Sequence, residues 1–127
     1  MISYTVVPID SIVELEVTGE LDLDASFILL LDVVRRADLA GHDLLIDLRK
    51  AQSDLSFKDV YRLVQFLDQH PDAFSGRLAL LDDYDDGFLK TQFLEASARD
   101  HGFEVRAFLK EAAAIAWLEG EPAPKHP

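Results

Sequence analysis

The order of strand-like and helix-like segments is the feature that most constrains what this chain can fold into. Three short apolar segments with strand character are each followed by a segment whose apolar residues recur at helical spacing. The pairs are 43–48 with 56–70, 77–81 with about 87–101, and 104–108 with 111–118. A helix between two strands carries the chain back along the sheet, so this alternation predicts parallel strands joined by right-handed crossovers.

Two β-rich segments precede these pairs and predict an antiparallel hairpin. They cover residues 3–7 and 12–18. In the second segment Val13 and Leu15 alternate with polar residues such as Glu14, which predicts one face in the core and the other in water. The predicted fold class is therefore α/β: a five-stranded mixed sheet, with the N-terminal antiparallel hairpin followed by parallel β-α units, and four helices.

The segment after the hairpin predicts the first helix. Asp24 is expected to cap its N-terminus, and Gly41 is expected to end it after about Ala40. At 100° per residue, the stripe facing the core is expected to contain Phe27, Leu30, Leu31, Val34 and Ala37.

Three further apolar residues of this segment, Ile28, Leu29 and Leu39, fall outside that stripe. They share an arc with charged residues that are expected to face water. A row of exposed apolar residues is typical of an interface, although single exposed apolar residues are also common. We therefore identify Ile28, Leu29 and Leu39 as candidate residues for a homodimer or partner interface.

The length of 127 residues suits one domain with one hydrophobic core. Gly120, Pro122 and Pro124 interrupt the last helical pattern. We expect a single domain over residues 1–120 and a short flexible tail over residues 121–127.

The charge and the residue content exclude several classes of partner and site. The net charge of −12 repels phosphate backbones and anionic lipids, so nucleic acid is not an expected partner. No segment approaches the roughly 20 apolar residues of a membrane-spanning helix, so stable membrane insertion is not expected. The absence of cysteine excludes disulfides and thiolate metal sites. Together with an N-terminus that lacks signal-peptide character, this favours a cytoplasmic location.

Ser56 and Asp59 stand at capping-box spacing at the start of the second predicted helix. Ser56 is therefore expected to cap that helix. A phosphate at a helix N-terminus is also stabilised by the helix dipole, so Ser56 is in addition a candidate phosphorylation site.

A candidate ligand edge is expected where the third and fourth strands end, because ligands of open α/β sheets bind at the carboxyl ends of strands. Arg49, Lys50 and Ser53 follow the third strand, and Asp82 and Asp83 follow the fourth. If the two strands are neighbours, these residues face one another and suit a small polar ligand or a basic peptide. A loop salt bridge is the alternative.

The acidic run over residues 82–86 does not have the spacing of a calcium loop. No histidines stand at the i, i+4 spacing of a metal site, and no serine lies in a nucleophile elbow. We therefore assign no metal, no cofactor and no catalytic residue, and we expect a protein that is not an enzyme.

Several strings of core and turn residues suggest a family. They are VTGELD at 17–22, LIDLR at 45–49, and EVRAF at 104–108 followed by the helical segment 112–118. The chain thereby resembles the STAS domains of bacterial anti-sigma-factor antagonists, and in particular the SpoIIAA-like group of small uncharacterised proteins. The resemblance implies the mixed-sheet fold described above and a protein partner.

In the antagonists that the chain resembles, a serine in an Asp-Ser-Ser-Gly motif at the start of a helix is phosphorylated to switch partner binding. The corresponding residues here are Leu55, Ser56, Phe57 and Lys58. Ser56 falls on the first serine, and Phe57 falls on the usual phosphoacceptor.

Three functional hypotheses follow. The first is a non-catalytic binding or regulatory module that acts through protein–protein interaction or self-association. The second is a carrier or sensor of a small apolar, lipid-like ligand, because the SpoIIAA-like group resembles CRAL-TRIO lipid-transfer domains in architecture. Phe66 and Phe93 would then line its cavity. The third is a metal-dependent hydrolase that uses the acidic run at 82–86.

Overall fold

The structure is a computed structural model, and it describes residues 2–9, 11–83 and 86–120, apart from the side chains at 86 and 87. The predicted tail at 121–127 lies outside the described residues. The elements are, in chain order, β1 (Ile2–Ile9), β2 (Ile12–Leu21), α1 (Leu23–Arg35), β3 (Asp43–Ser53), α2 (Phe57–Gln69), β4 (Leu78–Leu81), α3 (Asp86–Asp100), β5 (Val105–Phe108) and α4 (Glu111–Leu118).

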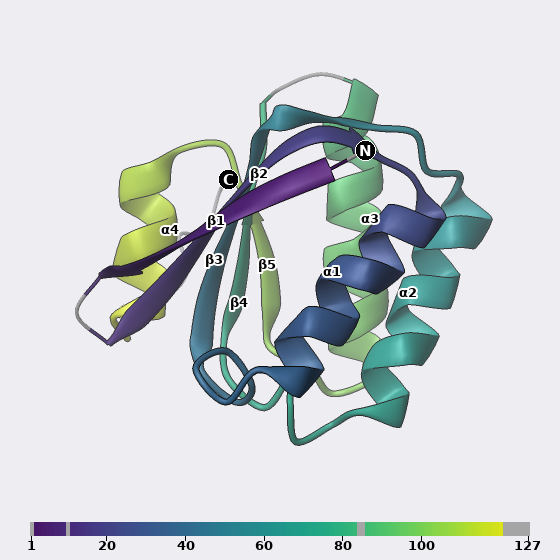
Figure 1. The fold of residues 1–127 in the computed structure, drawn as a ribbon. Helices are drawn as coiled ribbons and strands as arrows, with labels where there is room; N and C mark the ends of the chain where they lie inside the picture. Colours follow the sequence, from purple (N-terminus) through teal and green to yellow (C-terminus); the bar gives the residue numbers. More distant parts are fainter. Residues whose placement is uncertain (1, 10, 84–85, 121–127) are drawn as a thin grey trace.

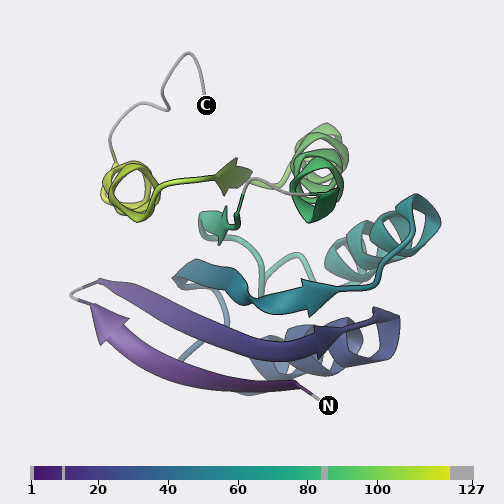
Figure 2. The ribbon, with the colours of Figure 1, turned by 90° about the horizontal axis from the view of Figure 1, so that it is seen from above.

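The strands form one mixed sheet in the order β1-β2-β3-β4-β5. β1 and β2 pair antiparallel, and each later strand pairs parallel with the one before it. The helices α1, α2 and α3 cover one face of this sheet, and α4 lies on the other (Figures 1 and 2). The predicted fold class is confirmed. None of the described helices combines the length and the apolar character needed to cross a membrane.

The hydrophobic core is divided between the two faces of the sheet. On the face covered by three helices, Leu15, Ile46 and Leu80 lie side by side on neighbouring strands and are almost fully buried. The smaller cluster beneath α4 combines strand and helix residues: Ile12, Leu45, Ala79, Leu81, Phe108, Ala114, Trp117 and Leu118. Because both faces are covered, the central strands are apolar on both sides, as is usual for parallel strands.

The second face of β2 is buried at the start of the strand, contrary to the prediction from its alternation, and is exposed only further along, at Thr18. Ile12 is 1% exposed, and the carboxylate-bearing Glu14 is 6% exposed. Both residues lie on the face that α4 covers, and α4 comes from the far end of the chain. A local pattern of alternating polar residues carries no information about that distant helix.

The first helix differs from its prediction in both extent and orientation. Its N-cap is Asp22, whose carboxylate accepts a hydrogen bond of 2.8 Å from the backbone N–H of Ala25, and the helix ends at Arg35. Apolar residues occupy almost every position from 27 to 31, so their spacing does not define one face. The buried residues are Ser26, Leu29, Leu30 and Val33, whereas those of the predicted stripe other than Leu30 are partly buried or exposed.

The interface predicted from this helix is wrong for two of its three residues. Leu29 is 4% exposed and Leu39 is 0% exposed, and both belong to the core of this domain. Leu39 lies in the turn after the helix, where a helical arc no longer describes the direction of its side chain. Ile28 is 60% exposed and is the one member of the three on the surface.

The predictions for the second helix are confirmed. The side chain of Ser56 accepts a hydrogen bond of 3.0 Å from the backbone N–H of Asp59, and Asp59 accepts one of 3.1 Å from the backbone N–H of Ser56. This reciprocal pair satisfies two donors at the helix start. The predicted stripe is buried against the sheet: Val60, Leu63, Val64 and Leu67.

Candidate functional site

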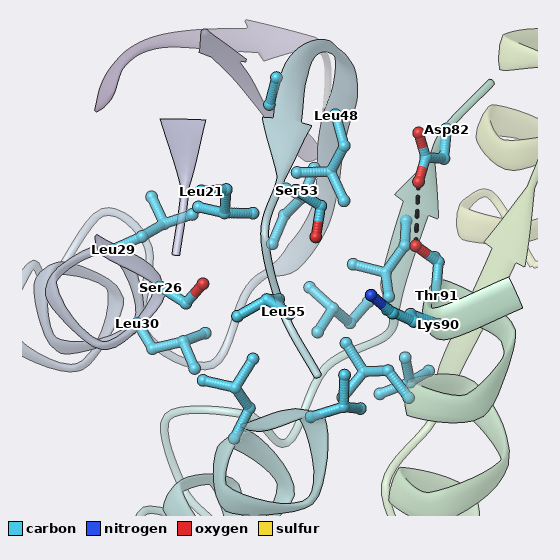
Figure 3. A pocket seen from close by; sticks show the side chains of 18 of the residues that line it. Leu21, Ser26, Leu29, Leu30, Leu48, Ser53, Leu55, Asp82, Lys90 and Thr91 are labelled. Carbon is cyan, nitrogen blue, oxygen red and sulfur yellow. Dashed lines mark hydrogen bonds between the residues drawn. The ribbon is translucent and has the colours of Figure 1, made fainter. Parts of the chain in front are cut away.

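A largely apolar cavity of about 370 Å³ lies between the sheet and the three helices on its larger face (Figure 3). Its apolar wall draws on each of these helices and on β2 to β5, and includes Leu30, Leu48, Leu63, Leu80 and Leu94. The volume falls within the roughly 300–1,000 Å³ of sites that bind small molecules. The cavity is therefore large enough to hold a small ligand.

Small side chains leave this space open. Ser26, Ala51 and Ser53 line the cavity at positions where larger residues would fill part of it. The hydroxyl of Ser26 donates a hydrogen bond of 2.8 Å to the carbonyl oxygen of Asp22, so its polar atom is satisfied within the helix. The small size of Ser26 therefore leaves room in the cavity, while its hydroxyl is already hydrogen-bonded within the helix.

One end of the cavity is polar. Asp82, which directly follows β4 and is 8% exposed, accepts a hydrogen bond of 2.9 Å from the hydroxyl of Thr91 on α3. Lys90 extends from the first half of α3 into the cavity, and Ser53 lies at the end of β3 (Figure 3). An apolar wall with a few polar groups at one end suits a ligand with an apolar body and a polar head.

A bulge in β3 decides which of its residues reach the cavity. The register with β2 runs from Glu16 opposite Asp47 to Thr18 opposite Lys50, so β3 carries one extra residue at this point. Such a bulge interrupts the alternation of faces along a strand. Leu48 and Ala51 consequently both line the cavity, although they are three positions apart.

The predicted ligand edge is brought together only in part. β3 and β4 are neighbours, and Ser53 and Asp82 line the same cavity. Arg49 instead forms an ion pair with Asp47. Lys50 and Asp83 are exposed and are not among the residues that line the cavity.

Two aromatic residues predicted to line the cavity do not do so. Phe66 lines a separate and more open pocket, where its ring lies 5.7 Å from that of Phe27. Phe93 is 37% exposed, and its ring packs edge to face on Phe57 at 5.2 Å. Sequence reasoning also missed Ala51, Lys90 and Thr91, because no local pattern shows that they share a cavity.

Ser56 remains both a helix cap and a candidate phosphorylation site. Its hydroxyl oxygen accepts the capping hydrogen bond described above, which accounts for a serine at this position. The residue is exposed at the surface, and its phosphorylation stays a prediction.

The acidic run at 82–86 is only partly described by the structure. Positions 84 and 85 and the side chain at 86 lie outside the described residues. Asp82 is bound to Thr91 and to the backbone N–H of Asp83. The described residues thus give the predicted metal-dependent hydrolase no support.

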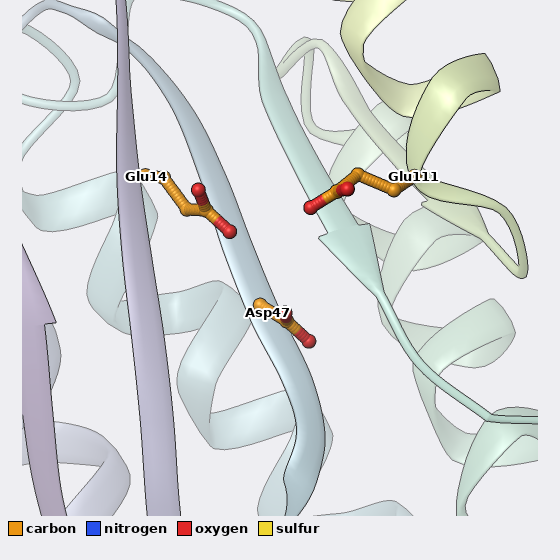
Figure 4. Close-up of side chains that lie close together, drawn as sticks. All are labelled: Glu14, Asp47 and Glu111. Carbon is orange, nitrogen blue, oxygen red and sulfur yellow. The ribbon is translucent and has the colours of Figure 1, made fainter. Parts of the chain in front are cut away.

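A different group of carboxylates meets on the other face of the sheet (Figure 4). Glu14 of β2, Asp47 of β3 and Glu111 of α4 each place a carboxylate oxygen within 4.8 Å of the other two. Glu14 and Asp47 are buried, whereas Glu111 is exposed. Of the three, only Glu14 was assigned to a face of a strand by the sequence patterns. They predicted that this face is in water.

Arg49 interacts unequally with these three carboxylates. Its guanidinium makes hydrogen bonds of 3.0 Å and 2.8 Å to the two oxygens of Asp47, and it lies 3.6 Å from an oxygen of Glu111. Burial opposes ionisation of Asp47, but the hydrogen bonds from Arg49 outweigh it and lower the pKa of Asp47. The pKa of Glu14 is raised, chiefly by burial and then by the charges of Glu111, Glu16 and Asp47.

Comparison with solved structures places this arrangement in a known fold. An uncharacterised protein of the DUF3478 family with a SpoIIAA-like fold, from Shewanella loihica PV-4, aligns with a TM-score of 0.58 at 16% identity over 92% of this chain and 93% of that one. The anti-sigma factor antagonist SpoIIAA in its unphosphorylated form aligns with a TM-score of 0.53 at 15% identity over 94% and 100% of the two chains. The chain therefore has a SpoIIAA-like, STAS-like fold. No family model matches the sequence, and a search of curated proteins finds no significant match.

Proposed function

We propose that the domain is a non-catalytic binding module that holds a small amphipathic ligand in the cavity between its sheet and α1, α2 and α3. The observation that carries this proposal is the 370 Å³ space with an apolar wall and a polar end. It is the feature that favours the hypothesis of a ligand carrier or sensor.

The lining residues indicate the chemistry of the ligand. Its apolar body contacts leucine side chains such as Leu30 and Leu63, because burial of hydrocarbon against apolar side chains is favourable. Its head lies near the ammonium of Lys90 and the hydroxyl of Ser53, which favour a carboxylate or another anionic group, while the carboxylate of Asp82 at the same end is engaged by Thr91 and by the backbone N–H of Asp83. A fatty acid has both parts and is the ligand class that we propose.

A variant that fills the cavity tests this function. We expect Ala51→Leu to weaken binding of decanoate at least about tenfold, because the added carbon atoms occupy ligand space within the cavity. Ala37→Leu makes the same chemical change at an exposed turn position and is expected to leave binding unchanged. Binding is measured by titration calorimetry on delipidated protein, and native mass spectrometry of protein from its own host shows whether a ligand is retained.

Two outcomes would contradict the proposal. Equal affinity of Ala51→Leu and Ala37→Leu for decanoate would place the ligand elsewhere on the protein. No binding of decanoate by the wild type, together with a ligand-free mass for the protein from its host, would remove the carrier function.

A second candidate function is interaction with another protein through an apolar patch on α2 and α3. The patch consists of Phe57, Tyr61, Leu89 and Phe93, which are 46%, 47%, 62% and 37% exposed. On each helix the two residues are four positions apart and so share one face. The packing of Phe57 on Phe93 joins the two helices into one surface.

The charge of the chain indicates the kind of partner. A second copy would bring another net charge of −12, so electrostatics disfavour self-association and favour a partner with a basic rim around an apolar contact. The neighbouring structure of SpoIIAA belongs to an anti-sigma factor antagonist, and this makes a protein partner a reasonable second candidate.

Aspartate substitutions distinguish this patch from other exposed apolar residues. We expect Phe93→Asp to weaken binding of a purified basic partner at least about tenfold, because aromatic residues dominate the energetics of protein interfaces. Ile28→Asp, at an exposed apolar residue of α1 that is not part of the patch, is the matched control. A partner lost equally from both variants, or a stable homodimer in sedimentation velocity, would contradict this candidate.

A further inference from the structure

The carboxylates of Glu14, Asp47 and Glu111 have the separation expected of ligands around one metal ion. Their oxygens lie within 4.8 Å of one another. Ca²⁺ binds oxygen at about 2.3–2.6 Å, so two of its ligands lie at most about 5 Å apart. The three residues come from β2, β3 and α4, and the carboxylates of Glu14 and Glu111 point toward one another (Figure 4).

Glu14 is the member of this group whose surroundings are unexplained without a ligand. It is 6% exposed, and among the described residues its carboxylate makes no hydrogen bond and no ion pair. Its carboxylate points toward Asp47 and Glu111 (Figure 4). A buried carboxylate requires either a proton or a compensating cation, because burial without a partner strongly disfavours the charged form.

The oxygens of Glu14 remain reachable from outside. Among the described residues, every side-chain oxygen or nitrogen that is fully enclosed has a hydrogen-bond partner. Since Glu14 has no such partner, its oxygens must retain some contact with solvent. Solvent and ions can therefore reach these oxygens, and Glu111, the third carboxylate of the group, is itself exposed at the start of α4.

The charges around the site match a divalent ion. When ionised, the three carboxylates and the guanidinium of Arg49 leave an excess of two negative charges. Oδ1 of Asp47 accepts hydrogen bonds from both the backbone N–H and the guanidinium of Arg49, whereas Oδ2 accepts one from the guanidinium and keeps a lone pair for a metal. Arg49 makes no contact with Glu14 within ion-pair distance, so the excess charge is concentrated there.

We propose that Glu14, Asp47 and Glu111 form a site for a hard divalent cation of the size of Ca²⁺, on the face of the sheet opposite the cavity. Water molecules complete its coordination. The bound ion joins the first turn of α4 to β2 and β3, so α4 is held on the sheet by the cation as well as by its apolar contacts. The proposal is independent of the cavity, which lies under the other three helices.

Titration calorimetry of EDTA-treated protein with CaCl₂, MnCl₂ or MgCl₂ tests the site. We expect one equivalent of Ca²⁺ to bind with a dissociation constant of about 10⁻⁴ M, typical of weak oxygen sites. Glu14→Gln should weaken binding at least about tenfold, since it replaces a charged ligand by a neutral group of the same shape. Glu20→Gln makes the same change at an exposed position of the same strand and should bind as the wild type does.

A third variant changes the affinity in the opposite direction. Arg49→Gln removes the positive charge that competes with the metal, and we expect it to tighten Ca²⁺ binding several-fold. Circular dichroism establishes that each variant is folded, and Glu111→Gln provides an exposed ligand substitution in case Glu14→Gln is not.

The proposal is overturned if the wild type binds none of the three ions, or if Glu14→Gln binds Ca²⁺ as tightly as Glu20→Gln does. It is also overturned if infrared spectroscopy shows that Glu14 keeps its proton at pH 7 in saturating Ca²⁺. In that case the buried carboxylate is neutralised by a proton rather than by a metal.

Discussion

Leu29→Asp is expected to unfold the domain, whereas the same substitution at the adjacent Ile28 is expected to be tolerated. Leu29 is 4% exposed and packs in the main core, so the change removes apolar burial and places a charge there. Loss of the leucine alone costs about 2–5 kcal/mol, and the buried charge adds to it. This approaches the total stability of about 5–15 kcal/mol of a typical domain.

Ile28→Asp is the control at a site that is 60% exposed, where we expect a change in the free energy of unfolding within about 0.5 kcal/mol. Both variants are measured by urea denaturation followed by far-ultraviolet circular dichroism. If Leu29→Asp stays folded as well as Ile28→Asp does, the orientation of α1 described above is wrong. In that case the residues from 27 to 31 face the sheet through another side of the helix.

Trp117→Ala is expected to destabilise the domain by about 3–5 kcal/mol, which is typical of an aromatic residue lost from a core. Trp117 is 8% exposed, and its ring lies 5.7 Å from that of Phe108. The guanidinium of Arg77 lies 5.1 Å from the centre of the indole. The cluster beneath α4 is small, so the loss of its largest side chain is expected to release α4 from the sheet.

Trp117→Phe keeps an aromatic ring and is expected to cost much less than Trp117→Ala. Circular dichroism is the appropriate probe, because the chain has a single tryptophan and both variants lack its fluorescence. Hydrogen exchange should show protection lost first in α4 of Trp117→Ala. Equal stability of the two variants, or loss of protection spread evenly over the sheet, would contradict the role of Trp117 in holding α4.

The elements that the sequence predicted best are those whose local signals agree. In α2, the capping box of Ser56 and Asp59 and the regular apolar stripe indicate the same start and the same buried face, and both are confirmed. α4 was predicted with the bounds that the structure shows. The hairpin and the strand–helix alternation sufficed for the mixed sheet, because chain order restricts how such elements can pair.

The first helix shows where local information ends. Its apolar residues are so dense from 27 to 31 that several faces are nearly equally apolar, and the choice depends on which face fits the sheet. The helix also ends at Arg35, before the turn that buries Leu39. The interface predicted from Leu29 and Leu39 failed for this reason.

By itself, the sequence determined the order of strands and helices, the mixed sheet and the cap of α2, because each depends on spacing or on contacts within a few residues. Only the tertiary structure decided the cavity and the carboxylate cluster. The bulge that brings Ala51 to the cavity is a property of pairing between two strands. Likewise, Glu14 and Glu111 are far apart in the chain, and they meet because α4 packs on β3, β4 and β5 and its first turn thereby brings Glu111 toward Glu14.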